Sequence, residues 1–369
     1  MSIDPATPRT APVRWGIIGC GEVTEVKSGP GFQKAEGSEL VAVMRRRGDL
    51  AADFARRHGV RAWYDDAAQL IADPMVDAVY IATPPGAHEE LALAVCAARK
   101  PAYVEKPMAR NHAECRRMVE AFAAAGVPLY VAYYRRALPR FVRARDLVAS
   151  GAIGRITGAS YRLAGPYHRD VEARQCTGAP LPWRQQAEHA GGGLLLDLGC
   201  HTLDILDFIL GPLEEARGVA ANLATPHDVE DAVALSFRTR DGAPGTAQWS
   251  FAAAERADEI VISGDRGEVR LSTFGAEPVE WRRGDAGPTQ RFDLPNPPHI
   301  QQPFIQSIVD ELRGRGRCQS TGVTAARTSA IIDAVLLGYY GTRDDGFWRR
   351  PETWPGRRAA SGPPPPSVS

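Results

Sequence analysis

Between residues 13 and 134 the sequence alternates short apolar runs with stretches of helical periodicity. The runs are Val13–Ile18, Leu40–Met44, Ala78–Ala82, Ala102–Val104 and Leu129–Tyr133. Continuous apolar runs of this length are typical of strands buried on both faces of a parallel sheet. Helical patterns at 49–58, 88–98 and 111–125 separate them. Repeated strand–helix units of this kind predict a doubly wound parallel α/β sheet.

After Leu138 the pattern changes. Five segments between about residues 214 and 272 alternate polar and apolar side chains, with tight turns such as Arg240-Asp241-Gly242 between them. This pattern predicts an open, mainly antiparallel sheet in a C-terminal α+β domain, with helices near 139–150, 301–315 and 322–341.

A length of 369 residues suits about two domains. We predict a disordered N-terminus over 1–12, a nucleotide-binding domain over 13–137, a substrate and oligomerisation domain over 138–345, and an extended, proline-rich disordered tail over 346–369.

The composition excludes several classes of protein. Lys+Arg and Asp+Glu are equal at 44 each, so no basic field favours nucleic acid or an anionic membrane. No apolar run approaches the roughly 18 residues of a membrane span, and the N-terminus does not resemble a signal peptide. The six cysteines are scattered without a Cys-x-x-Cys pair, which argues against a metal site and favours the cytoplasm.

A glycine motif, Gly19-Cys20-Gly21-Glu22-Val23-Thr24, follows the first strand and opens a helix. In a Rossmann domain the first glycine permits the tight turn, and the second lets the backbone approach a pyrophosphate at the helix N-terminus. The predicted contacts are Gly19, Gly21, Glu22, Val23 and Thr24. Two features depart from the usual fingerprint: Thr24 replaces the small third residue, and Gly29-Pro30-Gly31 interrupts the helix.

The end of the second strand indicates which dinucleotide binds. NAD-selective sites carry an acid here, whereas this chain has Met44-Arg45-Arg46-Arg47. Because guanidinium groups match phosphate oxygens, we predict NADP bound by Arg45 and Arg46, with NAD possible. The alternative is a solvated arginine turn.

The third strand end, Thr83-Pro84-Pro85-Gly86-Ala87-His88, is a further candidate for cofactor contact. Two prolines preset its backbone, and the Thr83 hydroxyl can donate to a ligand. We expect Thr83, Pro84 and His88 to contact the cofactor; alternatively His88 only begins a helix.

Glu105-Lys106-Pro107 ends the strand Ala102–Val104. Ligands of open α/β sheets lie beyond the carboxyl ends of the strands, so Lys106 is predicted to point into a crevice. Pro107 excludes Lys106 from the helical region and can fix the bend through a cis bond. A lysine held there can polarise a carbonyl or carry a proton, although a surface lysine before a turn is the simpler alternative.

A second polar cluster, Asp197, His201 and Asp204, falls at positions i, i+4 and i+7 of a predicted helix that follows three glycines, 191–193. These positions share one helical face. Because the other faces are apolar, the stripe must be paired or line a cavity. The alternative is a capping Asp with an exposed polar face.

Taken in order, Gly-x-Gly after strand one, Glu-Lys-Pro, and Gly-Gly-Gly-x-Leu-x-Asp-x-Gly-x-His-x-x-Asp resemble the Gfo/Idh/MocA family, which includes glucose–fructose oxidoreductase and inositol dehydrogenase. The resemblance runs from about Val13 to Tyr340. It implies that Lys106, with Glu105 beside it, contacts the nicotinamide ribose and a substrate oxygen. It also implies that Asp197 and His201 complete the catalytic group, that Asp204 supports it, and that Trp183-Arg184 approach the cofactor.

We therefore predict an NAD(P)-dependent oxidoreductase that moves a hydride between the cofactor and a hydroxyl or carbonyl carbon of a sugar, polyol or dihydrodiol. His201 is the predicted general base, Lys106 stabilises the developing alkoxide, and Asp197 orients them; His201 and Lys106 could exchange roles. The expected substrate contacts are Lys106, Tyr134, Arg135, Asp197 and His201.

Two other functions remain open: an NAD-dependent glycoside hydrolase of the same superfamily, and a non-catalytic NADP-binding sensor. The open face of the C-terminal sheet needs covering, which predicts a homodimer or homotetramer through that sheet.

Overall fold

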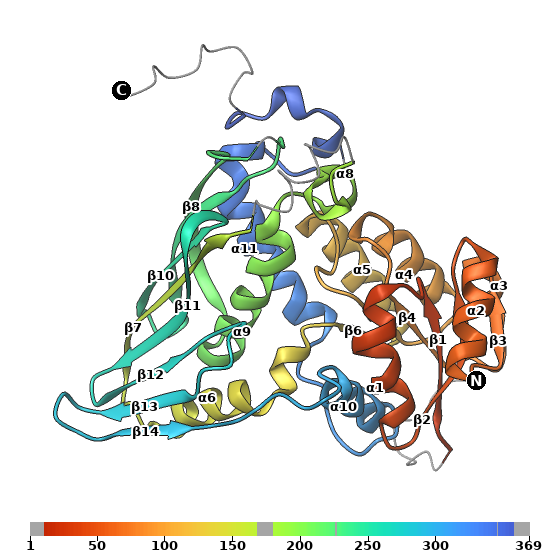
Figure 1. Cartoon of the computed structure of the whole chain (residues 1–369), viewed down its shortest axis with the longest axis horizontal. Coiled ribbons are helices and arrows are strands. Elements are labelled where there is room, and N and C mark those ends of the chain that lie inside the picture. Colours follow the sequence, from red (N-terminus) through yellow and green to blue (C-terminus); the bar gives the residue numbers. More distant parts are fainter. Residues whose placement is uncertain (1–10, 168–179, 226, 345, 358–369) are drawn as a thin grey trace.

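The structure, a computed structural model, describes residues 11–167, 180–225, 227–344 and 346–357. Two domains, each built on one sheet, lie side by side (Figure 1). No helix in this part of the chain is long and apolar enough to cross a membrane. The expected disorder at the N-terminus falls on residues 1–10, which lie outside the described ranges.

The N-terminal sheet has six parallel strands in the order β3-β2-β1-β4-β5-β6. Their bounds are β1 Val13–Ile18, β2 Ser38–Met44, β3 Ala62–Tyr64, β4 Ala78–Ile81, β5 Ala102–Val104 and β6 Leu129–Val131. The doubly wound sheet is confirmed, and its five predicted strands are present. β3 was not predicted, because three residues at a sheet edge carry too little periodicity to be recognised.

Helices cover both faces of this sheet: α1 Gly29–Lys34, α2 Gly48–His58, α3 Ala67–Ala72, α4 His88–Ala97 and α5 His112–Ala125. Local sequence sets their ends. The Asn111 side chain caps α5 by accepting from the N–H of Glu114, and Gly126 ends it with φ +62°.

The predicted interruption of the first helix is wrong. Thr24–Ser28 forms a π-helical segment that continues directly into α1. The N–H of Gly29 bonds to the carbonyl of Thr24, and a Cβ at Gly29 would lie 2.2 Å from that oxygen. The wider π turn accommodates Pro30, which has no N–H to donate, without breaking the helix.

The C-terminal sheet has eight strands in the order β14-β13-β12-β11-β7-β10-β9-β8. Their bounds are β7 Ile156–Pro166, β8 Leu213–Ala221, β9 Ala232–Thr239, β10 Pro244–Ser250, β11 Ala252–Gly264, β12 Gly267–Leu271, β13 Val279–Arg283 and β14 Thr289–Phe292. Only the β10–β7 pair is parallel, so the mainly antiparallel sheet is confirmed. The edge strand β14 and its neighbour β13 were not predicted.

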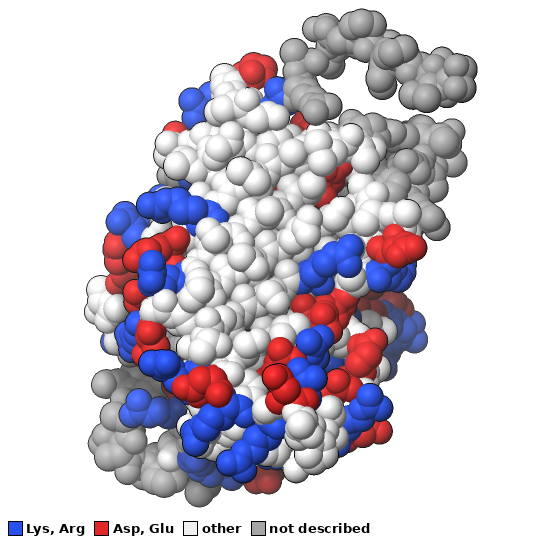
Figure 2. Space-filling view, turned by 90° about the vertical axis from the view of Figure 1, so that its left-hand side faces the viewer, with Lys and Arg blue, Asp and Glu red and all other residues white. Residues whose placement is uncertain are grey.

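One face of this sheet packs against α6 Pro139–Ala149, α9 Cys200–Leu210 and α11 Gly322–Tyr340 (Figure 1). α10 Gln302–Leu312 instead packs against α1 of the N-terminal domain. The opposite face is open, and Figure 2 shows on it a broad band without charged side chains. Exposed Ser160, Ala234, Ser236, Thr246 and Gln248 lie on it.

The prediction of a disordered chain from residue 346 is wrong for 346–357. Short 3₁₀ turns at Phe347–Arg349 and Pro351–Thr353 carry buried Trp348 and Trp354. The Trp354 ring meets Tyr340 edge-on at 4.6 Å between centroids. Burial of these aromatic rings outweighs the local proline content. Residues 358–369 lie outside the described ranges.

Candidate active site

The glycine turn lies between the carboxyl ends of β1 and β4. Gly19 has φ +93°, and a Cβ there would lie 3.0 Å from the Ala82 backbone. A Cβ at Gly21 would find only the Gly19 oxygen, at 3.9 Å, so the space beside it is open. Thr24 is fully buried and donates its hydroxyl to the Gly21 carbonyl at 2.6 Å. This hydrogen bond from Thr24 therefore stabilises the glycine turn.

The arginines after β2 are exposed. Arg47 pairs with Asp49 at 2.6 Å, whereas Arg45 and Arg46 form no ion pair with any described residue. No acid follows the strand directly. The geometry leaves two guanidinium groups beside the glycine turn.

Thr83 follows β4 and faces Gly19, with its methyl carbon 3.1 Å from a Cβ built there. Its hydroxyl is buried and has no hydrogen-bond partner. A buried hydroxyl without a partner is costly, so this atom is suited to a ligand. Pro84 beside it is exposed.

The expected cofactor contact of His88 is not supported, because its side chain is fully buried. Its Nε2 lies 2.7 Å from the Thr83 carbonyl, and its Nδ1 lies 3.1 Å from that of Pro107. Burial lowers the pKa of His88 against the opposing effect of these carbonyls. The ring joins the loops after β4 and β5 instead of facing a ligand.

Glu105 is also buried, and protein groups occupy its carboxylate. Oε1 accepts from Tyr80 at 2.5 Å and from the Gln301 amide at 3.1 Å, and Oε2 accepts from the N–H of Lys106. The Glu105 side chain therefore has a structural role instead of the predicted direct contact with the cofactor. The predicted cis bond between Lys106 and Pro107 is present. The hydrogen bond from its N–H to Glu105 helps to hold the Lys106 backbone in place.

Lys106 points to Asp197 of the other domain. Its Nζ donates to Asp197 Oδ1 at 2.7 Å and to the Asp197 carbonyl at 2.8 Å. Arg184 approaches the second carboxylate oxygen at 3.4 Å, and its guanidinium stacks 4.5 Å from the Trp183 ring centroid. The structure therefore brings Lys106 and Asp197 together, as the resemblance implied, and places Arg184 beside the same carboxylate.

Electrostatics keep this pair ionised. Burial by itself lowers the pKa of Lys106, but the Asp197 charge reverses that effect and the pKa is raised. Burial raises the pKa of Asp197, and Lys106 followed by Arg184 outweighs it, so the pKa is lowered. Lys106 is therefore an ammonium group through the neutral range.

His201, one helical turn beyond Asp197, is only 5% exposed. Tyr134 and Phe274 meet its ring edge-on, with centroids at 5.7 and 6.0 Å. Its Nδ1 is buried and has no hydrogen-bond partner in the described ranges. Burial, followed by the positive charges of Arg135 and Lys106, lowers its pKa well below the usual value. The imidazole is neutral at pH 7 and can accept a proton.

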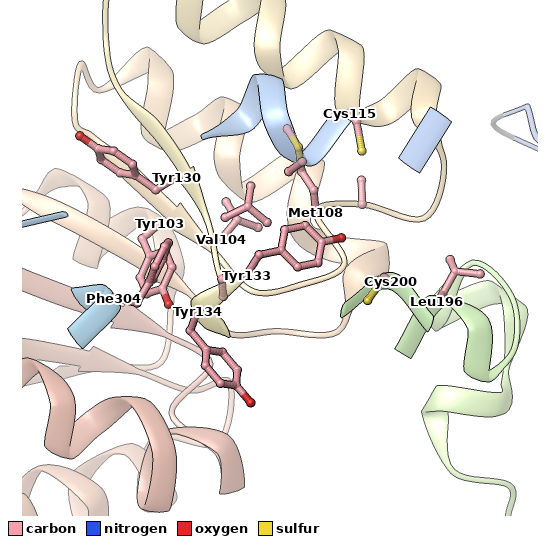
Figure 3. Close-up of a cluster of buried hydrophobic side chains, with 14 of the residues drawn as sticks. Tyr103, Val104, Met108, Cys115, Tyr130, Tyr133, Tyr134, Leu196, Cys200 and Phe304 are labelled. Atoms are coloured by element: carbon pink, nitrogen blue, oxygen red, sulfur yellow. The ribbon is translucent and has the colours of Figure 1, made fainter. Parts of the chain in front are cut away.

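Tyr133 and Tyr134 come shortly after β6 in the sequence, and Figure 3 shows that their side chains point in different directions. Tyr133 lies between Met108 and Cys200, whereas Tyr134 points away from that cluster. Arg135, 8% exposed, follows them and donates to the Tyr134 hydroxyl at 3.0 Å. The structure therefore places Tyr134 and Arg135 beside His201, as expected of substrate contacts.

Asp204 does not share a site with Asp197 and His201. It is fully buried and accepts from Arg136 Nη2 at 2.7 Å. Burial raises the pKa of Asp204 to about 6 against the opposing effect of Arg136. The predicted three-residue stripe is wrong because Arg136, 68 positions away in sequence, binds the Asp204 carboxylate.

Two family models match this chain. Residues 13–133 match "Oxidoreductase family, NAD-binding Rossmann fold", and residues 141–270 match "GFO/IDH/MocA C-terminal domain". Oxidoreductase P35 of Formosa agariphila is 35% identical over 89% of this chain and 99% of its own length. The chain belongs to the Gfo/Idh/MocA family of oxidoreductases.

Other Gfo/Idh/MocA relatives differ in their named substrates. A 1,5-anhydro-D-fructose reductase of Ensifer adhaerens is 28% identical over 90% of this chain and 99% of its own. A solved levoglucosan dehydrogenase in complex with NADH superposes with a TM-score of 0.78 at 22% identity, covering 88% of this chain and 96% of that one. The similarity to the levoglucosan dehydrogenase structure shows that the two proteins share a fold.

The residues of this Gfo/Idh/MocA oxidoreductase fit a nicotinamide dinucleotide. Gly21 leaves open space at the start of the first helix, where backbone N–H groups favour phosphate. The Thr83 methyl group faces the same turn, and the buried Thr83 hydroxyl has no hydrogen-bond partner among the described residues. The exposed Glu22 and half-buried Val23 begin the helix.

Some residues that shape this Gfo/Idh/MocA site were not predicted. Phe274 comes from the loop between β12 and β13, and Glu230 accepts from the N–H of Gly193 at 2.9 Å. Gln301 reaches Glu105 across 196 positions of sequence. None falls in a periodic or motif-like segment, so only their long-range contacts reveal them.

Proposed function

We propose that this protein is a dehydrogenase that oxidises a secondary alcohol of a sugar or polyol with NADP, and reduces the corresponding carbonyl in the reverse direction. The observation that carries the proposal is the ionised Lys106–Asp197 pair beside the neutral imidazole of His201. An ammonium group that can meet a substrate oxygen and a base that can take its proton are the two groups that alcohol oxidation requires.

In the oxidation, His201 accepts the hydroxyl proton while Lys106 stabilises the negative charge that develops on the oxygen. The nicotinamide ring supplies the hydride acceptor, at C4. Asp197 holds the Lys106 ammonium through its carboxylate and carbonyl oxygens. The carbon loses a hydride, which is one proton with two electrons. The hydroxyl proton passes to His201, which releases it to solvent. The raised pKa of Lys106 and the lowered pKa of His201 favour this assignment over an exchange of roles between the two residues.

NADP is proposed because Arg45 and Arg46 form no ion pair with a described residue and no acid follows β2 directly. Guanidinium groups bind a ribose phosphate, whereas an acid there would bind the free hydroxyls of NAD. Trp183 and Arg184 are proposed to cover the nicotinamide end. Relatives of known structure bind NADH, so NAD is the alternative cofactor.

The proposed substrate contacts are Lys106, Tyr134, Arg135, Asp197 and His201. Named relatives act on 1,5-anhydro-D-fructose, myo-inositol and levoglucosan, which are all polyhydroxylated rings. A hydroxyl-bearing ring of this class is therefore the proposed substrate, and the cytoplasm is the proposed location.

The open face of the C-terminal sheet is proposed to bind a second copy of the chain. Most exposed side chains of its central strands are small or neutral, with Arg162 on β7 and Arg238 on β9 as charged exceptions. Exposed Val219 lies on β8 at the same face, where Figure 2 shows a broad uncharged band. A contiguous uncharged surface of this kind is typical of a subunit interface.

A substrate screen tests the proposed reaction. Sugars, polyols and dihydrodiols are incubated with NADP and NAD, and nicotinamide absorbance is followed. Net formation of reduced cofactor supports a dehydrogenase. Glycoside cleavage without net change in reduced cofactor supports the hydrolase alternative and contradicts the proposal.

A further inference from the structure

Two adjacent arginines are buried at the end of the N-terminal domain, and they differ in their partners. Arg136 is 4% exposed and lies between two carboxylates, with Nη2 at 2.7 Å from Asp204 and 3.0 Å from Asp207. Arg135 is 8% exposed, and no described carboxylate pairs with it. Buried charges are normally paired, so Arg135 needs an explanation.

The neutral contacts of Arg135 fix its position. Nε donates to the Thr273 carbonyl at 3.2 Å, and Nη1 donates to the Tyr134 hydroxyl at 3.0 Å. The guanidinium carbon lies 5.1 Å from the Tyr134 ring centroid and 4.7 Å from that of Phe274. Within the described part of the chain, Nη2 donates to nothing. The group is thus held rigidly, with donor capacity left over.

The rings that hold Arg135 also border the proposed base. Tyr134 and Phe274 both meet His201 edge-on. Arg135 and the His201 imidazole therefore contact the same two aromatic rings. A small molecule that reaches His201 can reach the free edge of Arg135 as well.

The charges around His201 do not balance. Arg135, Lys106 and Lys27 all act to lower its pKa, and no acid in the described part of the chain opposes them. Asp197 already pairs with Lys106 and Arg184. An acid of the same wall, Asp258, directs its carboxylate to the N–H groups of residues 273–275. The pocket therefore carries excess positive charge.

We infer that Arg135 binds a carboxylate of the substrate, so that this enzyme acts on a sugar acid or hydroxy acid instead of a neutral sugar. The inference rests on the proposed dehydrogenase function and narrows its substrate class. Guanidinium matches the planar carboxylate, and the free edge of one mostly buried arginine offers too few donors for a phosphate dianion.

The test compares matched substrates on the full-length protein: D-glucose with D-glucuronate and D-galactose with D-galacturonate, each with NADP and NAD. We expect kcat/KM to be at least about tenfold higher for the acid, since a hydrogen bond to a charged group is worth that much or more. This comparison needs no variant. A preference for the neutral sugar, or for glucose 6-phosphate over glucuronate, overturns the inference.

Variants assign the preference to Arg135. R135Q should reduce the acid-to-neutral ratio of kcat/KM about 10- to 100-fold, and R135K should retain part of it. The matched control is R240Q, in an exposed turn of the C-terminal sheet, which should leave the ratio unchanged. An unchanged ratio in R135Q, with NADP binding intact as a check of folding, contradicts the assignment.

A binding measurement separates this inference from the proposed function. The thermal midpoint of the cofactor-loaded protein is recorded with glucuronate and with glucose. If no alcohol is oxidised, yet glucuronate alone raises the midpoint and R135Q abolishes the rise, the acid site stands and the dehydrogenase proposal fails. If neutral sugars are oxidised and glucuronate produces no shift, the dehydrogenase stands and the acid site fails.

Discussion

Lys106 and Asp197 lie 91 positions apart in sequence and in different domains, yet Lys106 Nζ is 2.7 Å from Asp197 Oδ1 and 2.8 Å from the Asp197 carbonyl. The double contact leaves one ammonium donor for a third partner. Both domains must therefore be in place before a substrate oxygen can be bound.

Removal of either partner should reduce turnover much more than cofactor binding. We expect K106A to lower kcat about 10²- to 10³-fold, as loss of an oxyanion donor does, and D197A to have a similar effect because Lys106 loses its anchor. NADP affinity, measured by fluorescence titration, should change little. K34A, at an exposed lysine, is the control. Full turnover in K106A would contradict the mechanism.

The neutral imidazole of His201 predicts the pH dependence of alcohol oxidation. Its lowered pKa keeps the base unprotonated through neutral pH, so kcat/KM should fall only on the acid side, below the usual pKa of about 6.5. H201Q should lower kcat about 10²- to 10⁴-fold and abolish this acid limb. An acid limb that persists in H201Q would assign the base to another residue.

The same group affects stability. Because the folded-state pKa of His201 is lowered, the unfolded chain binds more protons as pH falls below about 6.5. Stability should therefore be unaffected above that value and decline on acidification until the folded-state pKa is reached. The difference in thermal midpoint between H201Q and the native protein, measured from pH 8 to 5, isolates this contribution.

Arg45 and Arg46 should determine cofactor selectivity. The double variant R45E/R46E should raise the KM for NADP about 10- to 100-fold, since two charged hydrogen bonds to phosphate are replaced by repulsion, and should leave the KM for NAD nearly unchanged. R47A is the matched control, because Arg47 already pairs with Asp49. Equal loss with both cofactors would argue against a phosphate site.

The buried Arg136–Asp204 pair should be structural. D204A leaves the Arg136 charge with Asp207 alone, and we expect a loss of about 3–5 kcal/mol in the free energy of unfolding. D146A, at an exposed helical position, should cost much less. Chemical denaturation followed by circular dichroism measures both variants.

Charged substitutions on the open face of the C-terminal sheet test the proposed dimer interface. Thr246 and Ser236 are exposed at adjacent positions of β10 and β9. T246E/S236E should separate the proposed dimer, because two subunits would bring four carboxylates together without partners. Sedimentation velocity gives the oligomeric state; a monomeric native protein would rule out this interface.

The sheet class was predictable because apolar runs specify parallel strands, and Glu-Lys-Pro marks a strand end. That Lys106 and Asp197 belong to one group came from the resemblance to the Gfo/Idh/MocA family, since no local signal joins residues 91 positions apart. Pro107 allows the cis bond before it but does not require it.

The predictions that failed concern residues whose positions depend on contacts distant in sequence or on an irregular helical segment. His88 and Glu105 were expected to face the cofactor, but backbone carbonyls and Gln301 occupy them. Asp204 was misplaced because its partner, Arg136, lies 68 positions away in sequence. The order of residues 346–357 comes from aromatic packing against Tyr340, which composition does not indicate.

Tyr340 also hydrogen bonds to Glu230, the residue that holds the Gly193 N–H and with it the glycine loop before Asp197. The catalytic pair is thus supported from residue 80, through Tyr80 and Glu105, and from residue 340. On a ribosome, Lys106 and Asp197 would both emerge long before residue 340. Because α11 also packs against α5 of the N-terminal domain, the nascent enzyme should stay inactive until this last long helix has docked.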